Sequence, residues 1–340
     1  MQAKNSLPPA SPLGWRLISQ NAILNALACL HSADRTHAGQ TAQLVGFNSK
    51  QRLTCGSLTA TFPADKKWTA STSQMLDALW MLSVEEASHR DQNGTITFLT
   101  RTLARLLNRK NVKKVGETLR KVLALLTQTA VEWHGAYSLT LPQLLKSGEV
   151  HAGEVRLCWP ERVWEMLAPK SHAAGKEKGK GKHRVEFFLT PYPLALLALD
   201  CRRQGIEAHA YYLGRKALVQ KRANAGFARA DTLKGQTLLD ADPLIDSTTQ
   251  RASETISMVS AALAVLTGDP VRSEADRKAL FKTITVTQQE GETLDLDTLK
   301  GRGALDTLKK ASFKFEWATY PLASLTTLAK SKKKKAKKSL

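Results

Sequence analysis

Residues 95–127 read TITFLTRTLARLLNRKNVKKVGETLRKVLALLT, and they combine a short β-type run with two helical segments. The run 95–98 alternates like a strand, Thr100 can cap a helix through Leu107, and a polar turn at 108–111 follows. A further helix is predicted over about 112–127. Its apolar residues recur at i, i+4, i+7, i+8 and i+11 and predict one buried stripe: Val115, Leu119, Val122, Leu123 and Leu126.

The segments on either side extend this pattern. A helix is predicted over about 74–89, with Ser71 or Ser73 as its cap, and the stretch 43–62 predicts a hairpin or paired strands. After residue 127, the runs 130–133 and 137–141 predict a second hairpin, followed by a strand at 154–158. Helix, strand, helix, helix and hairpin is the order of a winged helix. Its third helix enters the major groove of DNA, and here the 130–141 hairpin would flank that helix over the backbone.

The charge of the chain points to a polyanionic partner. The 340 residues carry 50 Lys and Arg against 30 Asp and Glu, a formal net charge of +20. Two segments rich in lysine and poor in large apolar residues, 170–184 and 330–338, predict a disordered linker and a disordered tail. They are interpreted either as a solvated linker with a solubilising tail, or as segments that add salt-sensitive DNA affinity.

A compact basic cluster lies inside the predicted helices. Between Arg101 and Lys121 the only acidic residue is Glu117. We expect the arginines to read bases and the lysines to anchor phosphates, although a solvated helix face would show the same pattern. The candidate DNA contacts in this half are Arg101, Arg105, Arg109, Lys110, Lys113, Lys114, Arg120 and Lys121.

The second half contains four runs that match a known pattern. They are FFLTPYPLALLALD (187–200), YYLGRKALVQKRAN (211–224), TLLDADP (237–243) and ALDTLKKASFKFEWATYP (304–321). Over residues 187–320 the chain thereby resembles the C-terminal module of plasmid and mobile-element replication initiators. The resemblance implies two winged-helix domains that bind repeated sites at an origin and help to open the duplex. By position it also implies DNA contacts from Arg215, Lys216, Arg222 and Asn224.

One departure from the family pattern concerns the reading helix of the second half. The stretch 246–300 is longer and more acidic than the family pattern, which leaves open which helix reads DNA there. The apolar periodicity predicts a helix over 251–267, and the alternation of FKFEW predicts a strand over 313–317.

Several functional classes lack their motifs. There is no GxxxxGK[ST] loop, and the four cysteines form neither a CxxC pair nor a zinc-ligand pattern with histidine. Tyr211 and Tyr212 suggest a nicking nucleophile, but no His-x-His pair accompanies them. We therefore expect no catalytic residue, cofactor or metal. The N-terminus has no signal-peptide pattern, and no apolar run is long enough to span a bilayer, which predicts a cytoplasmic protein without a membrane partner.

Together these features predict a helix-rich α+β protein with two winged-helix domains joined by a basic flexible linker. The expected parts are an N-terminal domain (1–168), the linker (169–184), a C-terminal domain (185–325) and the lysine-rich tail (326–340). As a replication initiator it would bind double-stranded DNA at origin repeats, as a monomer or homodimer, together with host replication proteins. Two alternatives are a winged-helix transcriptional regulator and a basic structural or RNA-associated protein whose tail does most of the binding.

Overall fold

The structure is a computed structural model that describes most of the chain. The described residues are 15–20, 22–32, 40–45, 50–86, 89–135, 138–167, 188–224, 228–245, 251–268 and 279–318. The predicted linker (169–184) and tail (326–340) lie outside them. Within the described residues the fold is α+β, with helices packed on small antiparallel sheets, and none of these helices is long and apolar enough to cross a membrane.

Six elements make up what we call the first unit. Helix, strand, helix and helix follow one another as predicted, and the strand pairs β5–β9 and β9–β8 give the sheet order β5-β9-β8. The elements are α2 (Ala70–Glu85), β5 (Thr95–Leu99), α3 (Thr100–Leu106), α4 (Val112–Leu126), β8 (Ser147–His151) and β9 (Glu154–Cys158).

The helix caps explain where two of these helices begin. The Thr69 hydroxyl accepts a hydrogen bond from Thr72 N, and the Thr72 hydroxyl accepts one from Thr69 N, so α2 begins in a capping box. The prediction that Ser71 or Ser73 caps this helix was therefore wrong. Asn111 caps α4, because its side-chain oxygen accepts from Lys114 N at 3.0 Å.

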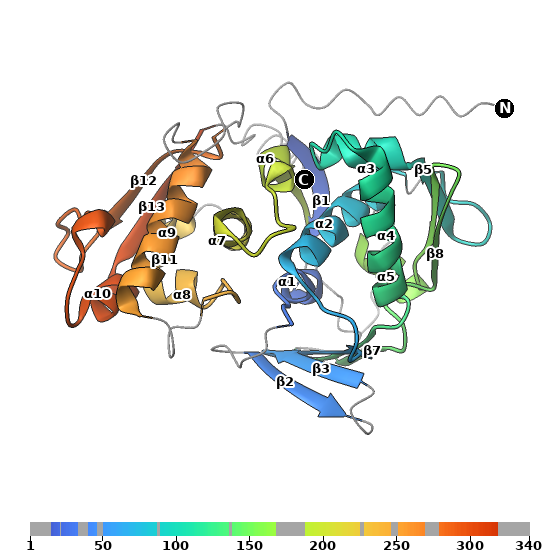
Figure 1. The fold of residues 1–340 in the computed structure, drawn as a ribbon, viewed down its shortest axis with the longest axis horizontal. Coiled ribbons are helices and arrows are strands. Elements are labelled where there is room, and N and C mark those ends of the chain that lie inside the picture. Colours follow the sequence, from blue (N-terminus) through green and yellow to red (C-terminus); the bar gives the residue numbers. More distant parts are fainter. Residues whose placement is uncertain are drawn as a thin grey trace, which may run out of the picture.

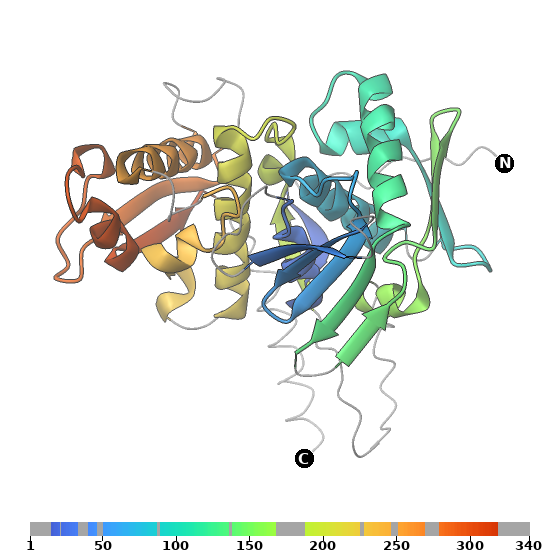
Figure 2. The same cartoon turned by 60° about the horizontal axis from the view of Figure 1, so that its bottom comes forward.

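The hairpin that completes the first unit is not the predicted one. The 130–141 hairpin exists as β6 (Ala130–His134) and β7 (Ser138–Leu141), but β6 pairs with β4 (Leu58–Pro63). Together with β2 (Gln40–Val45) and β3 (Lys50–Cys55) these strands form a separate five-stranded sheet (Figure 2). The predicted hairpin at 43–62 is thereby confirmed in β3 and β4.

The β8–β9 hairpin lies against β5 because their apolar residues are in register. Buried Leu157 and Val155 of β9 lie opposite buried Ile96 and Phe98 of β5. The turn between the strands contains Gly153 at φ 81°, a conformation that glycine adopts without strain. The sequence predicted a strand at 154–158 but none at 147–151, where Val150 is the only large apolar residue, so local alternation could not show that this hairpin joins β5.

The second unit repeats the same connectivity. Its sheet order, β11-β13-β12, matches that of the first unit element for element, so α7 occupies the place of α2 and α9 the place of α4. The predicted helix over 251–267 and strand over 313–317 are confirmed. The elements are α7 (Ile206–Ala223), β11 (Thr232–Lys234), α8 (Gly235–Leu239), α9 (Ala252–Thr267), β12 (Phe281–Thr287) and β13 (Ser312–Trp317).

Shorter elements surround the two units. The 3-10 turn η2 (Ala228–Asp231) precedes β11, and η3 (Leu296–Thr298) and α10 (Ala304–Lys310) lie between β12 and β13. Strand β1 (Trp15–Gln20) pairs antiparallel with β10 (Phe188–Pro193), so the start of the chain adjoins the start of the second half. Helices α1 (Ala22–Ala28) and α6 (Leu194–Ala198) lie between the units, and α5 (Glu161–Leu167) contacts β1 and α2 (Figure 1).

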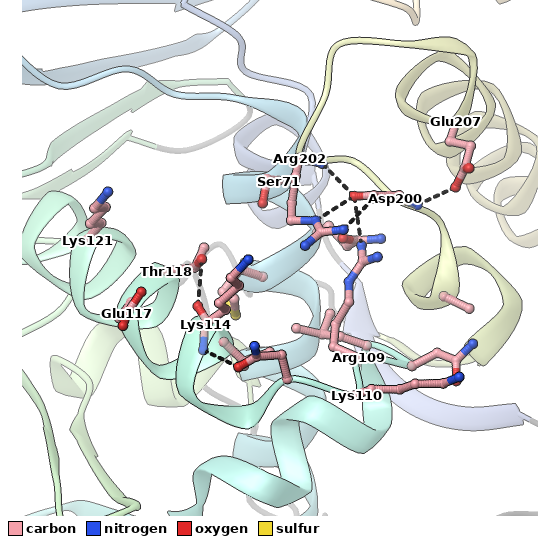
Figure 3. A pocket seen from close by; sticks show the side chains of 17 residues that line it. Ser71, Arg109, Lys110, Lys114, Glu117, Thr118, Lys121, Asp200, Arg202 and Glu207 are labelled. Atoms are coloured by element: carbon pink, nitrogen blue, oxygen red, sulfur yellow. Dashed lines mark hydrogen bonds and ion pairs between the residues drawn. The ribbon is translucent and has the colours of Figure 1, made fainter.

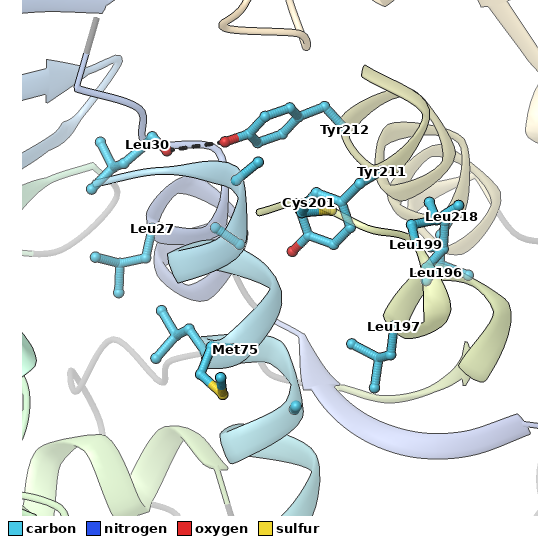
Figure 4. Close-up of a cluster of buried hydrophobic side chains, with 14 of the residues drawn as sticks. Leu27, Leu30, Met75, Leu196, Leu197, Leu199, Cys201, Tyr211, Tyr212 and Leu218 are labelled. Atoms are coloured by element: carbon cyan, nitrogen blue, oxygen red, sulfur yellow. Dashed lines mark hydrogen bonds between the residues drawn. The ribbon is translucent and has the colours of Figure 1, made fainter. Parts of the chain in front are cut away.

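A buried seam joins the two units along α2 and α7. The amide of Gln74 on α2 donates to the carbonyls of Leu196, Leu197 and Leu199 at 2.8–3.2 Å, at the C-terminal end of α6. From α7, the Tyr212 hydroxyl donates to the Leu30 carbonyl, within a cluster of leucine side chains (Figure 4). Helices α2 and α7 also meet directly, because Tyr211 and Arg215 of α7 donate to Asp77 of α2, and this contact joins the two units.

Candidate nucleic-acid interface

Helix α4 separates an apolar face from a basic face. The predicted apolar stripe, Val115, Leu119, Val122, Leu123 and Leu126, is buried. On the opposite side Lys113, Lys114, Arg120 and Lys121 are exposed, as is Glu117. Burial of the stripe therefore determines the direction in which the charged side chains point.

The turn before α4 and the helix α3 add further exposed cations. Lys110 is exposed in the turn, where Asn108 adopts φ 49°, and Arg101 and Arg105 are exposed one helical turn apart on α3. The β8–β9 turn lies at the start of this helix, because Thr100 N donates to the Gly153 carbonyl at 2.8 Å. Seven of the eight cations predicted in this half are thus exposed to solvent.

A groove of roughly 600 Å³ borders the basic face (Figure 3). Its lining comes from α2, the α3–α4 turn, α4 and the segment 198–207 of the second half. It brings together four predicted cations, Arg109, Lys110, Lys114 and Lys121, and adds Arg202, which we did not predict as a site residue. The sequence feature that could have identified Arg202 is the Arg-Arg pair at 202–203, which precedes Gly205 and the start of α7. In the structure both arginines are exposed.

Arg109 is the one predicted cation of this half that is turned inward. Its Nη2 donates to the Leu199 carbonyl at 2.7 Å and lies 3.4 Å from Asp200, and its side chain is 16% exposed. The DNA contact predicted for Arg109 stays a prediction, and this guanidinium already ties the α3–α4 turn to the second half. Burial lowers the pKa of Arg109, an effect that the charge of Asp200 opposes.

Asp200 bonds to two other residues that line the groove, Arg202 and Glu207. Its carboxylate accepts from Arg202 Nη2 at 2.6 Å and Nε at 2.8 Å, and its backbone N–H donates to Glu207. The hydrogen bonds from the Arg202 guanidinium hold the pKa of Asp200 well below its usual range. Asp200 therefore stays ionised and neutralises part of the positive charge on this wall.

Arg215 is buried and not available to DNA. Its Nε and Nη2 donate to the two carboxylate oxygens of Asp77 on α2, at 2.9 and 3.1 Å, and it is 2% exposed. We therefore correct the implied DNA contact from Arg215. The reason is that α7 is a central helix: a Cβ at Gly214 would lie 2.7 Å from the Leu196 side chain and 3.0 Å from that of Leu266.

The other predicted residues of α7 do not form an exposed basic face either. Lys216 is half-buried near Cys55, whose pKa is raised by burial to about 11 while Lys216 acts to lower it. Arg222 is half-buried, and the side chain of Asn224 donates to the Gln220 carbonyl at the end of α7. The structure thus distributes these residues along a packed helix and does not gather them at one surface.

Helix α9 has the place of α4 but a different surface. It contains neither lysine nor arginine, and its exposed residues include Ser253, Glu254 and Ser257. Also on α9, the Ser260 hydroxyl donates to Asp297 at 2.8 Å. The two units therefore share their connectivity, but the basic helix face belongs to the first unit.

Comparisons with known proteins give a likeness of overall structure only. No family model matches the sequence, and no curated protein matches it. Among solved structures, the chain is similar to a crystal structure of domains 2 and 3 of RctB. The sequence identity is 11% and the TM-score 0.47, and the match covers 86% of this chain and 98% of that one. A second RctB structure of the same domains matches with 10% identity and a TM-score of 0.44, over 86% and 96% of the two chains.

The tyrosines that suggested a nicking reaction are inaccessible. The Tyr211 hydroxyl donates to Asp77 at 2.7 Å, and both Tyr211 and Tyr212 are at most 1% exposed. Burial raises the pKa of Tyr211 well above its usual value, and the charge of Asp77 adds to this. A buried, protonated phenol cannot attack a phosphodiester, and no cluster of metal-ligating side chains occurs among the described residues.

A buried pair between α7 and the segment after α8 should make the stability of the fold depend on pH. His209 Nδ1 lies 2.7 Å from Asp242. Burial lowers the pKa of His209, but the charge and the hydrogen bond of Asp242 together raise it by more, so the net pKa is raised. Because the folded-state pKa is raised, this stabilisation should be complete below about pH 6.5 and lost as the pH rises through the folded value. Urea unfolding at several pH values should show this loss.

The variant His209→Gln serves as the comparison for this pH dependence. It cannot gain a proton, so its stability should fall less than that of the unsubstituted chain between about pH 6 and about pH 9. Equal pH dependence of the two proteins would contradict the assignment to His209.

Proposed function

We propose that this chain is a duplex DNA-binding protein of the replication-initiator kind, built on two winged-helix domains. The first and second units are the cores of these domains, which we place within residues 1–168 and 185–325. The observation that carries the proposal is the exposed basic face of α4, directed outward by the burial of its apolar stripe. In a winged helix the element in the position of α4 enters the major groove.

The chemistry of each side chain indicates whether it would contact phosphates or bases. Lys110, Lys113, Lys114 and Lys121 would neutralise phosphates on either side of the groove, which supplies affinity for any sequence. Arg120, whose guanidinium can donate two parallel hydrogen bonds, would recognise guanine edges. Arg101 and Arg105 on α3 would contact the backbone alongside.

The replication role has a separate basis. The four runs between 187 and 321 that resemble plasmid and mobile-element initiators support binding to iterated origin sites and opening of the duplex. We extend this to assembly with host replication proteins and to binding as a monomer or homodimer. Because α9 lacks cations, we assign sequence reading to the first unit and only a supporting role on DNA to the second.

Footprinting with the full chain tests this function. Origin DNA from the replicon that encodes the chain should show iterated protected sites, and adjacent AT-rich sequence should become reactive to a single-strand probe such as permanganate. The affinity should fall steeply with salt, because each neutralised phosphate contributes about one released counterion. A single protected site without melting would instead indicate a transcriptional regulator. Undiminished affinity at high salt would contradict the proposed phosphate contacts.

A further inference from the structure

The groove beside α4 has walls from both halves of the chain (Figure 3). Four residues recur at intervals of three or four positions and form the α4 wall: Asn111, Lys114, Thr118 and Lys121. They extend over about 15 Å of helix. The facing wall is the segment 198–207 of the second half, which contributes Arg202. Cations therefore line the groove from both sides.

The charge of this groove is only partly balanced within the protein. Its described lining residues include five cations and three carboxylates. Among the described residues, the exposed side chains of Lys110, Lys114 and Lys121 form no ion pair. Two of the carboxylates are already bound, since Asp200 accepts from Arg202 and Glu207 accepts from the Asp200 backbone N–H. The three lysines thus create a positive potential that attracts an anion.

Arg202 is positioned on the far wall with part of its guanidinium free for a ligand. Its side chain is 53% exposed, and its Nε and Nη2 donate to Asp200 at 2.8 and 2.6 Å. A guanidinium has five N–H donors in a planar fork, so the Nη1 edge can still donate to a phosphate oxygen. Because Asp200 already fixes the orientation of the guanidinium, less side-chain entropy is lost when an anion binds.

We propose that the groove holds the phosphate backbone of one DNA strand and that Arg202 binds a phosphate there from the side opposite α4. The inference rests on the proposed function, because a helix in the major groove has a phosphate backbone on each side of it. Lys114 and Lys121 would contact this backbone from the first unit and Arg202 from the second half. One strand is then held between the two halves, a contact that α9 cannot supply because it contains no cation.

Two neighbouring arginines give a matched pair of variants. Arg202→Ala removes the cation that lines the groove, and Arg203→Ala removes an equally exposed cation that does not line it. In the full chain, Arg202→Ala should lower the affinity for duplex DNA roughly fivefold at about 0.1 M salt and reduce the salt slope by about one. The loss should be the same for duplexes of different sequence, because a phosphate contact carries no sequence information. Arg203→Ala should change the affinity by less than about twofold.

Neutral linkages locate the contact on the DNA. The probe is a duplex that the full chain selects from a random-sequence pool, made with one uncharged methylphosphonate linkage at each position in turn. Each contacted phosphate should weaken binding when it is neutralised. The Arg202→Ala variant should become insensitive at one of these positions, while Arg203→Ala should keep the complete pattern.

The outcomes separate this inference from the proposed function. Equal affinities of the two variants, or the same methylphosphonate pattern in both, would overturn the contact from Arg202 and leave the groove to another anion, such as an acidic peptide. Urea unfolding of Arg202→Ala should match that of the unsubstituted chain, since the substitution removes only an exposed ion pair. Failure of the proposed function looks different, because the unsubstituted chain would then show no salt-dependent binding to any duplex.

Discussion

Removal of the exposed positive charges of α4 should lower the affinity of the chain for duplex DNA by about a thousandfold at about 0.1 M salt. Each charge that neutralises a phosphate releases close to one counterion, and three of these four side chains are assigned to phosphates, so the slope of log affinity against log salt should also fall by about three. The variant combines Lys113→Ala, Lys114→Ala, Arg120→Ala and Lys121→Ala. Fluorescence anisotropy with a labelled duplex at several salt concentrations measures both quantities.

A variant with the same loss of net charge separates a contact surface from general attraction. Four exposed cations in or next to the second unit can be replaced together: Lys300→Ala, Arg302→Ala, Lys310→Ala and Lys314→Ala. This control should retain most of the affinity, because these residues lie away from α4. Equal losses in the two variants would show that net charge, and not the face of α4, determines binding. Arg120→Ala alone should weaken binding to the preferred sequence more than to random DNA.

The largest effect on stability should come from Asp77→Ala. Asp77 accepts hydrogen bonds from Tyr192, Tyr211 and Arg215, and it is fully buried on α2. Its removal leaves the Arg215 guanidinium charged and unpaired between the two units, which costs about 3–5 kcal/mol of unfolding free energy. Urea denaturation followed by circular dichroism should show this loss.

Two further variants show whether the uncompensated charge is the cause. Glu290→Ala removes an exposed carboxylate and should change the free energy of unfolding by less than about 0.5 kcal/mol. The double variant Asp77→Leu with Arg215→Met removes both buried charges and should recover part of the stability lost in Asp77→Ala. No recovery would indicate that the tyrosine hydroxyl hydrogen bonds, and not the ion pair, dominate this seam.

Local sequence patterns predicted α2, β5, α3, α4 and β9 of the first unit, though not β8, and they predicted the outward charges of α4. The helical stripe from Val115 to Leu126 has a period that only one buried face can satisfy, so it also determined the side on which Lys113, Lys114 and Arg120 lie. The same local reasoning predicted α9 and β13. It needed no knowledge of which segments meet in space.

Pairing between distant segments could not be predicted in this way. The hairpin 130–141 alternates more clearly in sequence than the hairpin 147–158, yet the latter pairs with β5, because Val155 and Leu157 are in register with the buried residues of β5. Likewise, the run Gly214-Arg215-Lys216 has the composition of an exposed helix. Arg215 is buried because Asp77, 138 positions earlier in the chain, lies opposite it.

The two outcomes differ for a physical reason. The amphipathic period and the caps act over one or two helical turns, so the amino-acid order of α4 is sufficient to set its basic face. Whether a cation contacts solvent or a buried carboxylate depends instead on the burial and charge of residues brought close by packing. For this chain the exposed face of α4 is therefore a property of local sequence. The burial of Arg215, the inward turn of Arg109 and the groove shared with Arg202 arise only when the two units pack together.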